Sequence, residues 1–264
     1  DYNPYAAARF ERENGRPLLP ADQDPRPAET RDWFRRTGCA IRQEIVDYIH
    51  RLNDRVLVGV NWAGGFYGPT APLNVDFLTG DPWQQHCGNI YEVGLAVRQF
   101  ASQGLPSDVI STTFRWWGEW DRKAPEVNQR EAATVLANGS TYYVYNTLPP
   151  EGDVPWDHFS HLAQLTEFVA AREAVFKAGR PTPEVVVLNS EATFNAAHRN
   201  GDWLLARSHS VEEKRSALDF VHGVRPSVEG AARLLQNRGY AFGVTTEHDL
   251  NGLLEHARVV VLPN

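Results

Sequence analysis

Residues able to carry out acid–base chemistry follow strand-like segments in the first 150 residues. Asp81 ends one such segment, and Glu119 follows another, within Arg115–Asp121 (RWWGEWD). A pair of carboxyl groups can cleave a glycosidic bond, one as the acid and the other as nucleophile or base. The neighbouring tryptophans should desolvate the Glu119 carboxyl and raise its pKa, as a proton donor requires. We therefore name Glu119 and Asp81 as candidate catalytic residues; the alternatives are a solvated loop acid and a turn or capping residue.

Side chains suited to holding a sugar occupy the same strand ends. Indole rings can stack on the apolar faces of a sugar, and amide or guanidinium groups can bond its hydroxyls. The candidate substrate-binding residues are Asn61, Trp62, Trp83, Arg115, Trp116, Trp117, Trp120, Tyr145 and Asn146. Core packing and a structural ion pair are the alternatives for the tryptophans and for Arg115. Asp76 lies inside a strand, where a neighbouring strand or backbone amide is the expected partner.

Strands and helices alternate in this part of the chain. The strands are expected at Arg55–Asn61, Leu73–Asp81, Val109–Phe114 and Thr141–Thr147, and the helices at Ala28–Leu52, Asn89–Gln103, Glu126–Ala137 and Trp156–Lys177. In the first helix the apolar residues Trp33, Ile41, Ile45, Tyr48, Ile49 and Leu52 fall largely on one face. The alternation predicts an α/β protein with a parallel sheet or barrel, whose site lies at the carboxyl ends of the strands.

A second unit is expected after the Pro- and Gly-containing linker Gly179–Pro183. Its strands are predicted at Glu184–Ser190, Tyr240–Thr245 and Arg258–Pro263, and its helices at Ser227–Arg238 and Leu250–His256. This order is the start of a doubly wound sheet.

Composition and missing motifs exclude several classes of function. A net charge of −7 argues against a nucleic-acid partner, and no apolar run has the length of a membrane span. No glycine-rich nucleotide loop occurs, so we expect no cofactor. His86 and Cys87 are adjacent but lack a second ligand pair, so we expect no metal. The chain has no methionine, even at residue 1, which suggests a fragment or unwritten modified residues.

Several segments together resemble a group of bacterial glycoside hydrolases related to the family 42 β-galactosidases and to α-L-fucosidase-like hydrolases. The segments are Asp1–Phe10, Glu13–Gly15, Val58–Trp62, Asp76–Trp83, Trp117–Trp120, Ala137–Gly139 and Tyr145–Gly152. The part from Glu184 is similar to that group's glutamine-amidotransferase-like, or trimerisation, domain. The resemblance implies the second half of a (β/α)8 TIM barrel over residues 1–180 and an amidotransferase-like, flavodoxin-like α/β domain over residues 181–264. The first four barrel strands would precede residue 1.

What the resemblance implies is a retaining glycosidase, β-galactosidase-like or α-L-fucosidase-like, that acts on a glycoside or oligosaccharide without a cofactor. It also implies a homo-oligomer, a dimer or trimer, in the bacterial cytoplasm, with a secreted or periplasmic location left open. The nucleophile stays unassigned, because Thr113, Phe114 and Arg115 stand where family 42 has its glutamate. The competing hypothesis is a non-catalytic carbohydrate-binding protein. A phosphosugar enzyme would need a glycine-rich phosphate loop near the last strand, which Thr147–Pro150 does not supply.

Overall fold

A parallel sheet organises the first part of the chain, as the alternation of strands and helices predicts. The structure is a computed structural model that describes residues 3–20, 23–61, 73–82, 90–116, 119–145, 156–193 and 227–263. The strands of this sheet are β1 (Gly59–Asn61), β2 (Phe77–Gly80), β3 (Ser107–Thr112) and β6 (Thr141–Tyr145). The helices are α1 (Pro4–Asn14), α2 (Pro27–Leu52), α3 (Ile90–Ala101), α4 (Pro125–Ala137), α5 (Trp156–Ala170) and α6 (Glu173–Ala178).

The sheet is wound in one direction only. The strands pair in the order β1-β2-β3-β6, each parallel to the next, so each strand is added on the same side of the one before it. Because parallel crossovers are right-handed, this order brings the connecting helices to one face. Val97 of α3 and Val135 of α4 accordingly pack with Leu78 and Val109 in one buried core, which also includes Val46 of α2, the helix before β1. The predicted repeat is confirmed, and the described strands form an open sheet with edges β1 and β6, not a closed barrel.

A hairpin interrupts the repeat between β3 and α4. Its strands, β4 (Phe114–Trp116) and β5 (Glu119–Arg122), pair in antiparallel fashion. The sequence pattern assigned this segment to the end of one strand and a loop, because alternation over three or four residues is too short to recognise. The hairpin carries Glu119 at the first position of β5 and leaves the sheet beside the carboxyl end of β3.

The apolar face predicted for α2 is wrong in part. Trp33 is buried against the Phe10 ring of α1, with ring centroids 5.0 Å apart, and Val46 is buried in the sheet core. Four of the other predicted side chains form an exposed row, each at least half exposed, whereas Ile49 is half-buried; the four are Ile41, Ile45, Tyr48 and Leu52. The helical period is correct, but α2 carries apolar residues on two sides, and the period alone does not say which side meets the sheet. No helix in the described ranges combines the length and apolar character needed to cross a membrane.

A second parallel sheet follows residue 184. Its strands are β7 (Val185–Leu188), β8 (Phe242–Thr245) and β9 (Val259–Val261), and residues 227–237 and α10 (Leu250–Leu254) are helical. The order β8-β7-β9 places the first strand in the middle, so the chain reverses direction after β8. This is the doubly wound start that the sequence predicts, with β7 buried throughout Val185–Val187.

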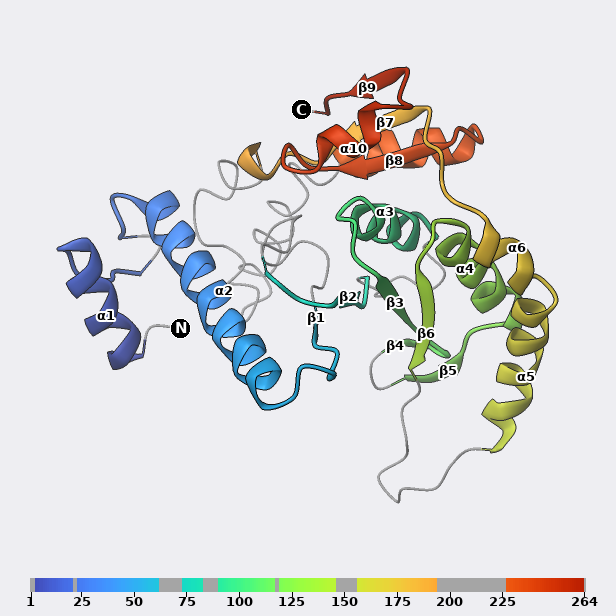
Figure 1. Ribbon diagram of the computed structural model, residues 1–264, viewed down its shortest axis with the longest axis horizontal. Coiled ribbons are helices and arrows are strands. Elements are labelled where there is room, and N and C mark those ends of the chain that lie inside the picture. Colours follow the sequence, from blue (N-terminus) through green and yellow to red (C-terminus); the bar gives the residue numbers. More distant parts are fainter. Residues whose placement is uncertain are drawn as a thin grey trace.

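The helix α3 joins the two sheets. One side of α3 contributes Val93, Val97 and Phe100 to the first core, while Leu95 packs against the core of the second sheet. Arg98 lies between them: its guanidinium stacks 4.0 Å from the centroid of the Phe242 ring, and Nε donates to the Phe242 carbonyl over 3.0 Å. Burial lowers the pKa of Arg98 to about 10. Figure 1 shows β8 next to α3.

Candidate functional site

Two of the predicted site residues meet at the carboxyl edge of the first sheet. Asn61 is the last residue of β1, and Asp81 directly follows β2. Because the strands are parallel, their carboxyl ends lie side by side, and Nδ2 of Asn61 donates to Oδ1 of Asp81 over 3.0 Å. Asn61 is exposed and Asp81 is half-buried. The arrangement orients an accessible carboxylate, which can accept a hydrogen bond from a ligand hydroxyl or take part in acid–base chemistry.

The face of the sheet opposite the helices carries a polar row. Side chains alternate along a strand, and since Leu78 and Val109 point into the helix-covered core, their neighbours point the other way. The strand register aligns Asn61, Thr79, Asp108 and Thr141 across all four strands. Within this row the Thr79 hydroxyl donates to the Asp108 carboxylate. Sequence reasoning missed Thr79 and Asp108, although the two-residue period of the strands could have identified them.

Aromatic side chains share this face near the carboxyl edge. Tyr143 is 53% exposed and Tyr145 is 36% exposed, and the register places them beside Ile110 and Thr112. The Phe114 ring meets Tyr145 edge-on, with centroids 6.0 Å apart. Exposed tyrosines in a parallel sheet are unusual, because such sheets are normally covered on both faces. This face therefore carries exposed aromatic side chains on β6, at the opposite edge of the sheet from Asn61 of β1.

The hairpin that carries Glu119 starts at the same edge. The backbone N–H of Thr113 donates to the carbonyl of Tyr145 over 3.2 Å, which fixes the start of β4 beside the end of β6. Arg115, Trp116, Glu119 and Trp120 lie on the two hairpin strands, and Trp116 pairs with Glu119. The structure describes the backbone of these residues, whereas their side chains lie outside the description.

Other predicted residues fall outside the described ranges. These are Trp62, Trp83, Trp117 and Asn146, together with the adjacent His86 and Cys87. Within the described ranges, no group of three or more His, Cys, Asp or Glu side chains is placed to hold a metal ion.

Asp76 has the structural partner that the sequence predicts. Its Oδ2 accepts from the backbone N–H of Val58 over 2.7 Å and from Nε2 of His50 over 2.9 Å. The hydrogen bond from Val58 lowers the pKa of the Asp76 carboxyl, and the contact with His50 adds to this effect. Asp76 precedes β2, so it lies at the amino end of the sheet, opposite the Asn61–Asp81 pair.

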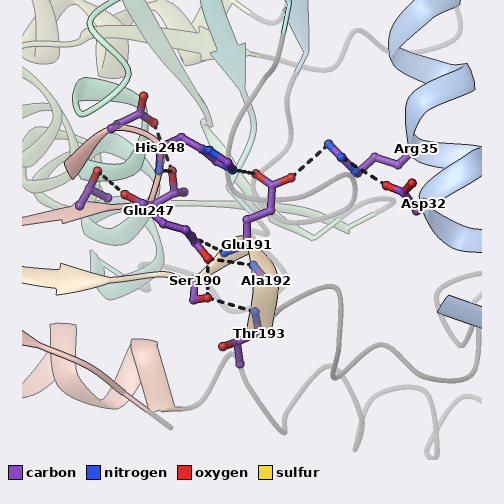
Figure 2. A network of polar contacts seen from close by, with 11 residues as sticks. Asp32, Arg35, Ser190, Glu191, Ala192, Thr193, Glu247 and His248 are labelled. Carbon is purple, nitrogen blue, oxygen red and sulfur yellow. Dashed lines mark hydrogen bonds and ion pairs between the residues drawn. The ribbon is translucent and has the colours of Figure 1, made fainter. Parts of the chain in front are cut away.

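A polar network lies at the carboxyl ends of β7 and β8 in the second sheet (Figure 2). Oε1 of Glu247 accepts from the Ser190 hydroxyl over 2.7 Å and from the Ala192 N–H over 3.0 Å, and Oε2 accepts from the Glu191 N–H over 2.8 Å. Burial raises the pKa of Glu247, but these hydrogen bonds outweigh burial and lower that pKa to about 2. In many doubly wound sheets such backbone N–H groups bind a phosphate. Here the Glu247 carboxylate already occupies them.

The same network reaches the first part of the chain. The buried carboxylate of Glu191 lies 3.1 Å from Nη1 of Arg35 on α2 and 3.5 Å from Nε2 of His248. Asp32, one turn before Arg35, lies 3.4 Å from its other terminal nitrogen. Figure 2 shows Glu191 between Arg35 and His248, so the ion pair connects α2 to the helical residues 191–193 that follow β7.

Comparison of the chain with protein-family models, with curated proteins and with solved structures finds no match. A functional assignment therefore depends on the chemistry and geometry of the chain's own residues.

Proposed function

We propose that this chain is part of a retaining glycoside hydrolase built on a (β/α)8 barrel. The observation that supports the proposal best is the carboxyl edge of the first sheet. There the Asp81 carboxylate is held by Asn61, exposed tyrosines lie on the same face, and the hairpin bearing Glu119 begins. Acidic, amide and aromatic side chains gathered at the carboxyl ends of parallel strands form the kind of site in which a barrel enzyme binds a sugar.

The one-way winding of the sheet supports the barrel. A sheet that grows in one direction covers only one of its faces with its own helices, and the other face becomes buried when the sheet curves and closes. The face opposite the described helices holds the row Asn61, Thr79, Asp108 and Thr141, and among the described residues each edge strand pairs on one side only. The helix α2, with its exposed apolar row, directly precedes edge strand β1 in the sequence. In the proposed barrel, a further βα unit next to β1 would cover this row. In our proposal, further βα units pair with β1 and β6 and close the barrel.

In this proposal each site residue has a specific role. Glu119 donates a proton to the leaving oxygen, and Asp81 orients the substrate or acts as the second carboxylate. Asn61, Arg115 and Tyr145 bind sugar hydroxyls, together with Asn146, while Trp62, Trp83, Trp116, Trp117 and Trp120 supply stacking surfaces. The reaction uses carboxyl groups alone, so no cofactor is required. The β-galactosidase-like or α-L-fucosidase-like substrate, the homo-oligomer and the bacterial cytoplasmic location also remain predictions.

The variant Glu119→Gln tests the proposed acid in the full-length protein. Glutamine keeps the shape of the side chain but cannot transfer a proton. Turnover of natural glycosides should fall by about 10²–10⁴-fold, whereas activated aryl glycosides, whose leaving groups need little protonation, should be spared. Glu126→Gln is the matched control, because Glu126 is an exposed glutamate in the first turn of α4 and should behave as the wild type.

The outcomes separate the alternatives. An equal loss of turnover on natural and on activated aryl glycosides would exclude Glu119 as the acid. It would indicate that Glu119 is the nucleophile or that the variant is misfolded. No loss would exclude Glu119 and leave Asp81 as the candidate acid. A wild-type protein that binds oligosaccharides without hydrolysing them would refute the enzyme and favour the carbohydrate-binding alternative.

A further inference from the structure

The hairpin β4–β5 is held at its base by buried side chains. Phe114, the first hairpin residue, is 5% exposed, and Lys123, which directly follows β5, is 3% exposed. The backbone N–H of Lys123 donates to the carbonyl of Thr113 over 2.8 Å and closes the base of the hairpin. Both ends of the hairpin therefore enter the interior beside the carboxyl end of β3.

The Lys123 side chain continues into the space between β3 and α4. Its ammonium Nζ lies 3.1 Å from Oε1 of Glu131 and donates to the Ser111 hydroxyl over 3.2 Å. Glu131 is 2% exposed, and its Oε2 accepts from Ser111 over 2.5 Å. A buried ammonium is stable only where its donors find acceptors, and here the acceptors come from one helix and one strand of the sheet.

Two further side chains extend the hydrogen-bond network around this ion pair. Tyr142 of β6 donates its hydroxyl to Oε2 of Glu131 over 3.1 Å, and Asn128 of α4 donates to the Tyr142 hydroxyl over 2.8 Å. Asn128 also donates to the carbonyl of Thr112 over 3.0 Å, at the last residue of β3. Burial, followed by the Glu131 charge, raises the pKa of Tyr142, so this hydroxyl stays protonated. The network thus connects the hairpin to β3, β6 and α4 together.

Desolvation offsets much of the attraction in a buried ion pair, so the pair adds little net stability, whereas removal of one partner is strongly destabilising because it leaves the other charge uncompensated. The Lys123 ammonium donates to Ser111 of β3 and to Glu131 of α4. These contacts fix the position of Lys123, and therefore the end of β5, relative to β3. Glu119 stands four residues before Lys123 on the same strand segment. We therefore expect a change in the position of Lys123 to displace β5 and with it Glu119.

We propose that Lys123, through its ion pair with Glu131, is a positioning residue that holds the Glu119 hairpin at the carboxyl edge of the sheet. The functional part of this inference rests on the glycosidase proposed above. The positional part concerns the hairpin alone and is measurable without any activity.

The first measurement is ¹⁹F NMR of the full-length protein labelled with 5-fluorotryptophan, with resonances assigned by Trp→Phe variants. Three of the eight tryptophans of the chain, Trp116, Trp117 and Trp120, belong to the hairpin segment. In Lys123→Met the resonances of these three should shift or broaden, and those of the other five should stay in place. Lys177→Met is the matched control, since Lys177 pairs with Glu173 on α6 with its side chain 75% exposed.

A double variant separates positioning from stability. Lys123→Met alone leaves Glu131 buried without its cation, which can prevent folding. Lys123→Met with Glu131→Gln removes both charges and keeps an acceptor for Ser111 and Tyr142, so folding should recover. The hairpin resonances should remain displaced in this variant, and kcat for glycosides should fall about tenfold or more with KM less affected, because small displacements of a catalytic group are costly.

The outcomes are distinguishable. Hairpin resonances that coincide with those of the wild type in a folded double variant would refute the positioning role. Full recovery of both resonances and kcat with folding would show that the pair is merely structural. Displaced resonances in a protein whose wild type hydrolyses no glycoside would uphold the positioning and refute the proposed function.

Discussion

The Glu247 carboxylate should stabilise the junction of β7 and β8 in a pH-dependent way. The ionised carboxylate accepts hydrogen bonds from Ser190, Glu191 and Ala192 more strongly than the neutral acid would, and these bonds lower its pKa from 4.5 to about 2. A shift of this size corresponds to an upper limit of about 3 kcal/mol. Because Glu247 is exposed, screening by water reduces the expected contribution to about 1–2 kcal/mol.

The test is Glu247→Gln, followed by urea unfolding at several pH values between 7 and 3. Glutamine keeps one acceptor oxygen for Ser190 and Ala192, but its amide nitrogen then faces the N–H of Glu191. The folded-state pKa is depressed, so the contribution is complete above pH 4.5 and is lost as the pH falls towards 2. At pH 7 the variant should therefore be about 1–2 kcal/mol less stable than the wild type, and this difference should shrink at pH 3.

A matched control separates this contact from a general charge effect. Glu255 is an exposed glutamate directly after α10 in the same unit, and Glu255→Gln changes the net charge equally. It should leave the free energy of unfolding within about 0.5 kcal/mol of the wild type at every pH. A loss in Glu247→Gln that is the same at pH 7 and pH 3, or no larger than that in Glu255→Gln, would refute the reasoning.

Two further predictions concern structural residues outside the candidate site. Arg98→Met should lower the free energy of unfolding by about 2 kcal/mol, measured by urea titration, because it removes the hydrogen bond to the buried Phe242 residue and the stacking on its ring. Asp76→Asn should destabilise the protein at pH 7 and lose this effect as the pH falls below about 3.8, since the folded-state pKa of Asp76 is lowered. Because Asp76 lies at the amino end of β2, kcat of the folded Asp76→Asn variant should equal that of the wild type, and a lower kcat would contradict the structural role.

The sequence predicted the elements of both sheets well because short apolar runs with β-branched residues have few alternatives to a buried strand. Val185–Val187 and Phe242–Thr245 are almost completely buried, and each follows a helix breaker within a few residues. In such segments, burial, β-propensity and turn residues favour the same structure. The same reasoning identified Asp76 as a structural residue with a backbone amide as partner, although Asp76 lies just before β2 and not inside the strand as predicted.

Features that depend on contacts between distant residues were not predictable. The Lys123–Glu131 pair joins a hairpin to a helix, and the Arg35–Glu191 pair joins residues more than 150 positions apart. No local sequence pattern marks either pair. Lys, Arg and Glu are usually exposed, so the sequence does not show which of them is buried and paired. The α1 helix was also missed, although Asn3 caps it by accepting from the Ala6 N–H over 2.9 Å. That cap is a local signal of the kind that a closer reading of Asn3-Pro4 would use.

The different winding of the two sheets determines where each can bind a ligand. A doubly wound sheet binds at the point where the chain reverses, outside the carboxyl ends of the neighbouring strands. In the second sheet this point is next to β7, where Glu247 occupies the backbone N–H groups and Glu191 is paired with Arg35. A sheet wound in one direction has no such reversal, and a barrel built from such a sheet places its site along the carboxyl edge, where the candidate residues Asn61, Asp81 and Tyr145 lie. The carboxyl edge of the first sheet therefore retains accessible acidic and aromatic side chains. In the second sheet, Glu247 is engaged with Ser190, Glu191 and Ala192, and Glu191 is paired with Arg35 of α2.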